Sequence, residues 1–441
     1  MYGIILLRTD EHSLPARHNS TGGECAVTHV TPRTKENRKR RLLLPLTLLL
    51  LMLVTAAALL PRMASGATAA APIPHKARIV QYVQDSSSFP ISDENAAHVD
   101  QLNYAFALLQ DGRADVSHMH GLDEVKRFLR RHPHIDGVLS VGGWGADGFS
   151  EACATAAGRQ LLCNSILSLM DAHGFVGVDI DWEYPGMTAG GVASSDDDVE
   201  NWYALLALLR QGLDERERAN GREYVLSVAL GAGEDHMTAV DGARLNELVD
   251  QAVVMAYDLR GFDRMTGHHA GLYPDGETML SGAWAVQSWL SSGLDPDRIL
   301  LGIPQYGRMW RSVASETDGL HARAETSGNK VILQDEIPSL IESGYTRRFD
   351  EHAKAPYLFN GMNFVSYDDE ESVRAKAEYI LEHDLLGAAL WAAGHDTGSV
   401  LPAALSEAFA LSEPSPAPEE PAETPALNGE QNFSQVVDNP A

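Results

Sequence analysis

Eight short apolar segments, each followed by a longer segment, are the feature that most constrains how this chain can fold. We expect β-strands at Arg78–Tyr82, Gln101–Ala107, Gly137–Gly143, Gly177–Glu183, Tyr224–Ala229, Val253–Asp258, Ile299–Tyr306 and Gly387–Trp391. Helical patterns lie between them, for example at Asp123–Arg131, Ala157–His173, Asp197–Gln211, Leu245–Asp250, Gly282–Ser291 and Glu371–Glu382. Because strand-then-helix units build parallel sheets, and eight of them can close into a ring, this order predicts an α/β protein with a (β/α)8 TIM barrel.

The connection after the seventh expected strand is too long for a single helix. Residues 309–363 contain strand-like and loop segments of their own, so we expect a small inserted α+β subdomain there. A doubly wound open sheet is the alternative architecture for the same alternation. No glycine-rich dinucleotide-binding fingerprint follows the first expected strand, which makes the open sheet the less favourable choice.

The fourth expected strand carries three acidic residues at alternate positions. Successive side chains of a strand point to opposite faces, so Asp179, Asp181 and Glu183 share one face at intervals of about 7 Å. Apolar residues, Trp182 among them, share the other face. The apolar face suits the surrounding helices, and the acidic face is therefore expected to point into the barrel.

Three carboxyl groups in such a place are costly for stability. Like charges this close cannot all ionise, so at least one pKa must rise. A catalyst that needs a protonated carboxylic acid near neutral pH benefits from that rise. The alternatives are a metal cluster or a solvated edge strand, and the apolar neighbours and the lack of an interleaved histidine argue against both.

The segment that begins at Asp179, DIDWEYPG, closely resembles the signature of glycoside hydrolase family 18, the chitinase family. The family pattern has one more acid, three positions before Asp179, where this chain has Val176. That acid is usually the least essential of the four, so the departure concerns pKa tuning and rate more than activity itself.

Other segments resemble motifs of the same family in the same order, and the resemblance covers about residues 77–408. They are Ser140–Trp144 (SVGGW), Met255–Asp258 (MAYD), Thr266–His269 (TGHH), Gly302–Arg308 (GIPQYGR), Ser366–Asp369 (SYDD) and the tryptophan of the eighth strand. We expect the small residues of SVGGW to let a sugar approach the backbone. Gln305 stands where the family more often has an apolar residue.

The resemblance implies a retaining glycosidase whose substrate supplies the nucleophile. Glu183 would protonate the glycosidic oxygen, and the 2-acetamido oxygen of the substrate would attack the anomeric carbon. Asp181 would hold the acetamido N–H, and Asp179 would share a proton or charge with Asp181. Tyr257 would orient the acetamido group.

Further substrate contacts are expected at or near the ends of the barrel strands. By resemblance, Asp258 would support the distorted sugar and Trp391 would form an apolar floor beneath it. For the remaining candidates, sugar binding competes with ordinary barrel packing: Tyr82, Phe106, Trp144, Met255, Tyr306 and Arg308. Trp182 is expected in the core, and His268 and His269 are expected to be loop residues and not catalysts.

The charge balance excludes several classes of partner. The 441 residues include 61 Asp and Glu but only 34 Lys and Arg, a formal net charge of −27. Such a surface repels nucleic acid and anionic lipid, whereas an uncharged sugar suits it. No cluster of His, Cys and Asp has metal-site spacing, and no phosphate-binding loop is present, so we expect no cofactor and no metal.

The N-terminal part differs from the rest of the chain. Residues 1–41 form a basic extension, and residues 42–60 are 19 uncharged, mostly apolar positions followed by small residues. We interpret residues 42–71 as a signal peptide with its cleavage zone or as a retained membrane anchor. Because 41 residues are many before a signal, we hypothesise that translation starts downstream, for example at Val30.

Residues 72–411 are expected to form the catalytic barrel, and residues 412–441, rich in Pro, Glu and Ala, a disordered acidic tail. Cys153 and Cys163 could pair in an exported protein. However, Cys163 belongs to an apolar stripe at helical spacing with Ile166 and Met170, which favours buried core thiols.

Together these features predict an exported, extracytoplasmic and monomeric glycosidase that reaches a membrane only through an uncleaved N-terminal segment. Chitin or its oligosaccharides are the leading substrate. Other N-acetylglucosamine glycans, such as cell wall or N-glycan cores, are the alternative within the enzyme class. Outside that class, the alternatives are an inactive sugar-binding lectin on the same fold and a purely structural surface protein.

Overall fold

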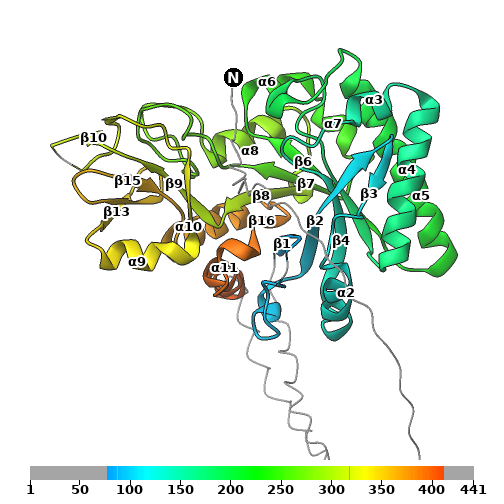
Figure 1. Ribbon diagram of the computed structural model, residues 1–441, viewed down its shortest axis with the longest axis horizontal. Helices are drawn as coiled ribbons and strands as arrows, with labels where there is room; N and C mark the ends of the chain where they lie inside the picture. The colour runs from blue at the N-terminus through cyan, green and yellow to red at the C-terminus, as the bar shows by residue number, and fades with distance from the viewer. Residues whose placement is uncertain (1–76, 87, 317, 412–441) are drawn as a thin grey trace, which may run out of the picture. The chain divides into compact units, whose positions relative to one another are not determined.

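Eight parallel strands close into a barrel in the computed structural model, which describes residues 77–86, 88–316 and 318–411 (Figure 1). In chain order they are β1 (Arg78–Gln84), β2 (Gln101–Gln110), β4 (Asp136–Gly142), β5 (Gly177–Asp181), β6 (Val225–Gly231), β7 (Gln251–Met255), β8 (Ile299–Pro304) and β16 (Gly387–Trp391). The ring closes because β1 pairs with both β2 and β16. The expected (β/α)8 barrel is confirmed, and the open sheet is excluded.

Helices cover the outside of the barrel. They are α2 (Leu122–Arg131), α3 (Phe149–Cys153), α4 (Ala156–His173), α5 (Asp198–Asn220), α6 (Glu234–Ala239), α7 (Gly242–Leu245), α8 (Gly282–Ser291), α10 (Glu370–Glu382) and α11 (Val400–Leu411). Two of these helices begin at a capping residue. The side chain of Thr155 accepts a backbone N–H of α4, and the side chain of Ser281 accepts a backbone N–H of α8.

Two helical expectations need correction. The first strand is followed only by a short 3-10 turn, Asn95–His98, and the antiparallel strand β3 (Arg113–Asp115) extends β2. The helix expected at Leu245–Asp250 is wrong, because α7 ends at Leu245 and Asp250 instead accepts the backbone N–H of Leu226. Helix α11 completes the eighth strand–helix unit, and it packs on the N-terminal turn and on β1.

The insertion after β8 is a five-stranded antiparallel sheet with one helix (yellow in Figure 1). Its elements are β9 (Tyr306–Trp310), β12 (Lys330–Leu333), α9 (Ile337–Glu342), β13 (Thr346–Asp350), β14 (Ala355–Phe359) and β15 (Phe364–Ser366), with a small β-ribbon of β10 (Val313–Ala314) and β11 (Arg323–Ala324). The insertion therefore begins earlier than expected. Tyr306 opens its first strand and does not belong to the barrel strand β8.

Cys153 and Cys163, the two cysteines within the described residues, are free and buried, as the apolar stripe around Cys163 on α4 predicts. Burial raises the pKa of Cys163 to about 11 and that of Cys153 to about 12, which keeps both thiols protonated. Within the described residues no helix has the length and apolarity needed to cross a bilayer. The expected basic extension, signal or anchor segment and acidic tail lie outside those residues.

Candidate active site

The acidic residues of β5 lie at the carboxyl end of the barrel strands, the end where barrel enzymes carry their sites. Asp179 and Asp181 are buried in the barrel, 0% and 5% exposed. The strand ends at Asp181, so Glu183 lies just beyond it, partly exposed, and not within the strand as expected. Trp182 points outward and stacks on Phe149 with ring centroids 5.0 Å apart, which confirms its place in the core.

Neighbouring strands hold the deepest carboxylate in place. Tyr82 on β1 donates its hydroxyl to Asp179 Oδ2 at 3.0 Å, and Ser140 on β4 donates to the same oxygen at 2.6 Å. Burial nevertheless raises the pKa of Asp179, and the hydrogen bonds of Ser140 and Tyr82, together with the nearby hydroxyl of Ser227, offset only part of that rise. The sequence reasoning missed Ser140 and Ser227, although both lie opposite Asp179 in the strand register.

The two outer carboxyl groups have raised pKa values as well. Burial, followed by the charges of Glu183 and Asp179, raises the pKa of Asp181 well above its usual range. Burial also raises the pKa of Glu183 to about 7, and the charge of Asp258 adds to the rise against a hydrogen bond of Tyr184 that lowers it. A carboxyl with this pKa is half protonated at neutral pH and can both give and take a proton.

Two phenols stand beside these carboxyls. Tyr257 follows β7, and its pKa is raised well above the ordinary value by burial and then by the charges of Asp181 and Glu183. Tyr184 is affected in the same way and was not among the expected site residues. Both hydroxyls therefore stay protonated and are available as hydrogen-bond donors.

Asp258 lies in the opposite electrostatic environment. Arg308, the third residue of β9, donates from Nε to Asp258 Oδ1 at 2.8 Å and from Nη2 to Oδ2. His269 Nδ1 lies 3.5 Å from Asp258 Oδ1. Burial by itself would raise the pKa of Asp258, but His269 and Arg308 more than offset it and hold the pKa at about 2.

The aromatic candidates fall into two groups. The indole of Trp391, at the end of β16, stacks on Phe106 with centroids 5.4 Å apart and contacts Tyr82 at 5.6 Å. These three rings form one apolar surface next to Asp179. Trp144 is 38% exposed, and an added Cβ at Gly190 would lie 3.5 Å from its ring, so Trp144 lines the loop after β5.

The remaining candidates surround Tyr257. Tyr306 is buried, and its ring lies edge-on to Tyr257 with centroids 6.3 Å apart. Met255 is the last residue of β7 and half-buried.

Val176 is buried beside the start of β5, where its N–H donates to the carbonyl of Gly137. The position that is acidic in the family is therefore apolar and enclosed in this chain.

The glycines of the third-strand motif lie where the barrel wall is closely packed. An added Cβ at Gly142 would lie 2.1 Å from the carbonyl oxygen of Asp181, and one at Gly143 would lie 2.6 Å from the ring of Phe106. Gly143 also donates its N–H to the Asp181 carbonyl at 2.8 Å. Both residues have positive φ, 117° and 91°. The small residues thus let the barrel wall close on Asp181 and Phe106.

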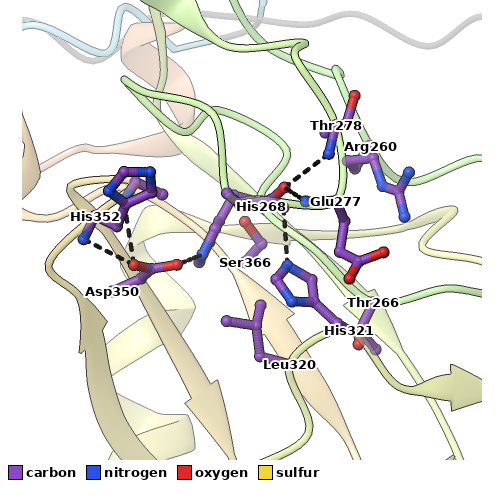
Figure 2. Close-up of polar contacts among 12 residues, drawn as sticks. Arg260, Thr266, His268, Glu277, Thr278, Leu320, His321, Asp350, His352 and Ser366 are labelled. Atoms are coloured by element: carbon purple, nitrogen blue, oxygen red, sulfur yellow. Dashed lines mark hydrogen bonds and ion pairs between the residues drawn. The ribbon is translucent and has the colours of Figure 1, made fainter.

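The two adjacent histidines after β7 differ in what they contact. His268 Nε2 lies 3.0 Å from Asp350 Oδ2 at the end of β13, and His321 Nε2 lies 3.0 Å from Asp275 Oδ2 (Figure 2). These pairs join the loop after β7 to the insertion. His269 is fully buried and faces Asp258, a contact that sequence reasoning did not anticipate.

A metal site does not emerge from the described part of the chain, where no group of three or more His, Cys, Asp or Glu could hold an ion. A (β/α)8 barrel with buried acids at its carboxyl end and an aromatic surface beside them defines the class of a barrel glycosidase. The chain matches the sequence model of the glycosyl hydrolases family 18 over residues 78–396 and belongs to that family. The resemblance found in the sequence is thereby confirmed.

Individual relatives agree with this assignment. The chain is 32% identical to chitinase A1 of Niallia circulans over 306 residues, which are 64% of this chain and 43% of that protein. It is also 32% identical to chitotriosidase-1 of Mus musculus over 289 residues, 61% of this chain and 60% of that protein. The chain therefore spans less than two thirds of the length of either relative.

Solved structures of the family superpose on the barrel. A family 18 N-acetylglucosaminidase from Paenibacillus barengoltzii gives a TM-score of 0.72 at 34% identity and covers 76% of this chain and 100% of its own. A family 18 chitinase of Cycas revoluta, solved as a mutant in complex with (GlcNAc)4, gives 0.69 at 27% identity with coverage of 76% and 100%.

Proposed function

We propose that this protein is a retaining glycoside hydrolase that cleaves β-1,4 bonds at N-acetylglucosamine units, with chitin or chitooligosaccharides as substrates. The observation that carries the proposal is Glu183, a partly exposed carboxyl with a pKa of about 7 directly beyond the buried Asp181. The names of the related chitinases and the (GlcNAc)4 bound to the Cycas protein support the choice of substrate.

The first step breaks the glycosidic bond. Glu183 donates its proton to the glycosidic oxygen, and the leaving sugar departs as an alcohol. The acetamido oxygen of the remaining sugar attacks the anomeric carbon and forms a cyclic oxazolinium ion. Asp181 accepts the acetamido N–H and stabilises the positive charge that develops there, and its buried Oδ1 has no hydrogen-bond partner within the described residues.

The second step reverses these roles. Glu183, now a carboxylate, takes a proton from water as the water attacks the anomeric carbon. The ring opens, the acetamido group is restored, and two inversions give net retention. Asp179 shares charge with Asp181 along one face of β5. The hydrogen bonds that Tyr82 and Ser140 donate to Asp179 stabilise this charge in its buried position.

Other residues hold the sugar in the reactive geometry. The protonated hydroxyl of Tyr257 donates to the acetamido group, and Trp391 with Phe106 provides the apolar surface on which the sugar ring lies. Asp258, kept ionised by Arg308, accepts from sugar hydroxyls. No step calls for a cofactor or a metal.

Release of single sugars from a chain end is a second candidate for the mode of cleavage. The match to the N-acetylglucosaminidase from Paenibacillus barengoltzii covers the whole of that chain, at 34% identity. The match to the chitinase of Cycas revoluta also covers the whole of that chain, at 27% identity. Product lengths from (GlcNAc)6 separate the two modes: monomer from the first moments of the reaction indicates exo cleavage, whereas dimers to tetramers indicate endo cleavage.

The test of the proposal is hydrolysis of N-acetylglucosamine oligomers by the full chain and by Glu183→Gln. Wild-type cleavage that Glu183→Gln lowers by ~10²–10⁴-fold supports the general acid. The matched control is Glu378→Gln, an exposed residue of α10, which should keep the full rate. Equal rates in wild type and Glu183→Gln would contradict the proposal.

Binding without cleavage would favour the lectin alternative. The matches include the oviduct-specific glycoprotein of Ovis aries, 30% identical over 281 residues, whose name does not describe a hydrolase. If the wild type neither cleaves nor binds chitin oligomers, cell-wall and N-glycan substrates are next. We also propose that the protein is exported and acts as a monomer, which N-terminal sequencing of the extracellular fraction and sedimentation would test.

A further inference from the structure

His269 is the buried titratable group of this site that the proposed mechanism leaves without a role. Its side chain is fully buried, and neither ring nitrogen has a hydrogen-bond partner within the described residues. A buried polar group without a partner costs free energy, so an electrostatic contact with a nearby charge would offset part of that cost. The nearest charged atom is Asp258 Oδ1, 3.5 Å from Nδ1.

The backbone fixes His269 in this position from two sides. Its N–H donates to Ser366 Oγ at 2.9 Å at the end of β15, and its carbonyl accepts the N–H of Leu259, the residue after Asp258, at 3.0 Å. The preceding residue, His268, is tied to Asp350 of the insertion (Figure 2). The imidazole is thus held against Asp258 by both the barrel loop and the insertion.

The ring is neutral in this environment. Burial lowers the pKa of His269, and the positive charge of Arg308 acts in the same direction, against Asp258 and Asp368, which raise it. The fourth group that faces the ring is Tyr306, with centroids 5.4 Å apart. A neutral imidazole carries one N–H, and the carboxylate of Asp258 favours the tautomer with that hydrogen on Nδ1.

We propose, on the basis of the glycosidase function above, that His269 is a positioning residue of the reaction: its Nδ1–H and the guanidinium of Arg308 together hold the Asp258 carboxylate in place beside Glu183. Arg308 approaches Asp258 from the insertion, and His269 approaches it from the loop after β7. The histidine thereby fixes a charge that acts on the proton of Glu183, without touching the substrate.

Two amide substitutions separate this role from simple packing. In His269→Asn the amide N–H₂ replaces the donor at Nδ1, whereas in His269→Gln it lies near the former Nε2 and faces away from Asp258. We expect His269→Asn to keep kcat within about threefold. His269→Gln should lose kcat by roughly ten- to a hundredfold, because the polar contact with the charged Asp258 is lost, with a smaller change in KM.

The pH profile adds a readout that packing would not change. The rate should fall at high pH as Glu183 loses its proton, and we call this decrease the alkaline limb. Because the negative charge of Asp258 is less compensated in His269→Gln, the alkaline limb should move to higher pH in that variant and stay in place in His269→Asn. The control is His321→Gln, which breaks the neighbouring pair with Asp275 and should leave kcat and the limb unchanged. Equal behaviour of the two His269 variants, active or inactive, would overturn the proposal.

Failure of the proposed role of His269 can be distinguished from failure of the proposed glycosidase function. Hydrolysis by the wild type and its loss in Glu183→Gln establish the function before the His269 variants are compared. If the wild type hydrolyses nothing, the same pair is compared by carboxyl-carbon NMR of Asp258. His269→Gln should then raise the pKa of Asp258, and His269→Asn should not; an unchanged value in both would overturn the proposal independently of activity.

Discussion

Two groups of carboxylates lie at the mouth of the same barrel, and their surroundings shift their pKa values in opposite directions. Asp179, Asp181 and Glu183 come from one strand end, and burial raises the pKa of all three. Asp258 is also enclosed, but Arg308 reaches it from the insertion and its pKa falls to about 2.

The barrel and the insertion contribute differently to these two environments. The barrel wall supplies neutral hydrogen-bond donors to Asp179, and burial keeps ionisation of the three β5 acids unfavourable, so a proton remains available near neutral pH. The insertion supplies a cation, which creates a permanent charge. A barrel without the insertion would have the proton donor but not the fixed anion beside it.

The largest expected effect comes from Glu183→Gln, and it should separate activity from stability. The rate should fall by ~10²–10⁴-fold, whereas the free energy of unfolding at pH 7 should be unchanged or higher, because a buried carboxyl is removed from a cluster of like charges. Hydrolysis rates and urea unfolding measure the two effects. A clear loss of stability would show that the β5 acids stabilise the fold after all.

Most of this fold could be predicted because its strands are buried on both faces and therefore read as apolar runs. All eight barrel strands lie within a few residues of their expected positions. The boundaries failed where another interaction ended an element: Pro304 closes β8 before Tyr306 because the chain enters a second sheet there. The first connection contains only a short 3-10 turn, and helix α11, which follows the eighth strand, packs on that turn and on β1, a long-range contact that local periodicity does not encode.

Arg308→Met should have the opposite signature, a loss of stability. It leaves the enclosed Asp258 without its bidentate partner, and breaking a buried pair on one side costs about 3 kcal/mol. Unfolding in urea at pH 7 measures this cost. Arg308→Lys is the matched variant, since it keeps the charge but not the paired hydrogen bonds, and should lose less. If Arg308→Met were as stable as the wild type, Asp258 would not differ from the β5 acids in its dependence on a cation.

The pH dependence of stability should also have opposite signs in the two groups. Glu183 holds its proton more tightly in the folded state, so stability should fall by about 3 kcal/mol as pH rises from about 4.5 to about 7. Asp258 holds its proton less tightly, so its contribution of about 2 kcal/mol is present above about pH 4 and lost as pH falls to about 2.

Unfolding curves of two variants assign these changes. Glu183→Gln should flatten the profile between pH 4.5 and 7, the range set by its ordinary and shifted values. Asp258→Asn should flatten it below pH 4. Profiles that stay parallel to wild type in both variants would assign the pH dependence to other carboxyls.

The smallest effect is expected from Tyr82→Phe, which removes one donor to Asp179. The loss should be about 1–2 kcal/mol of stability, with a decrease in kcat because Asp179 no longer keeps its orientation. Tyr203→Phe is the control: the Tyr203 hydroxyl on α5 bonds to the backbone of Asp241 at the start of α7, so the substitution should cost a similar free energy of unfolding and no activity. Equal rate losses in both would remove Tyr82 from the site.

The candidate site was predictable only in part. Alternation along one strand identifies Asp179, Asp181 and Glu183, because a strand fixes which side chains share a face. The pairing of Asp258 with Arg308 and His269 joins the end of β7, the start of the insertion and a loop, and only the folded chain brings them together. The expectation that His269 is a loop residue is correct for its backbone but says nothing of the carboxylate it faces.

The most direct test of the account is the pH dependence of kcat/KM for wild-type hydrolysis of an N-acetylglucosamine oligomer. The account predicts a rate that falls about tenfold per pH unit above an alkaline limb near pH 7, where Glu183 loses its proton. A rate that already declines above about pH 5, as for an ordinary carboxyl, or one that stays level to pH 9, would contradict the claim that the buried acids of β5 keep a proton for catalysis.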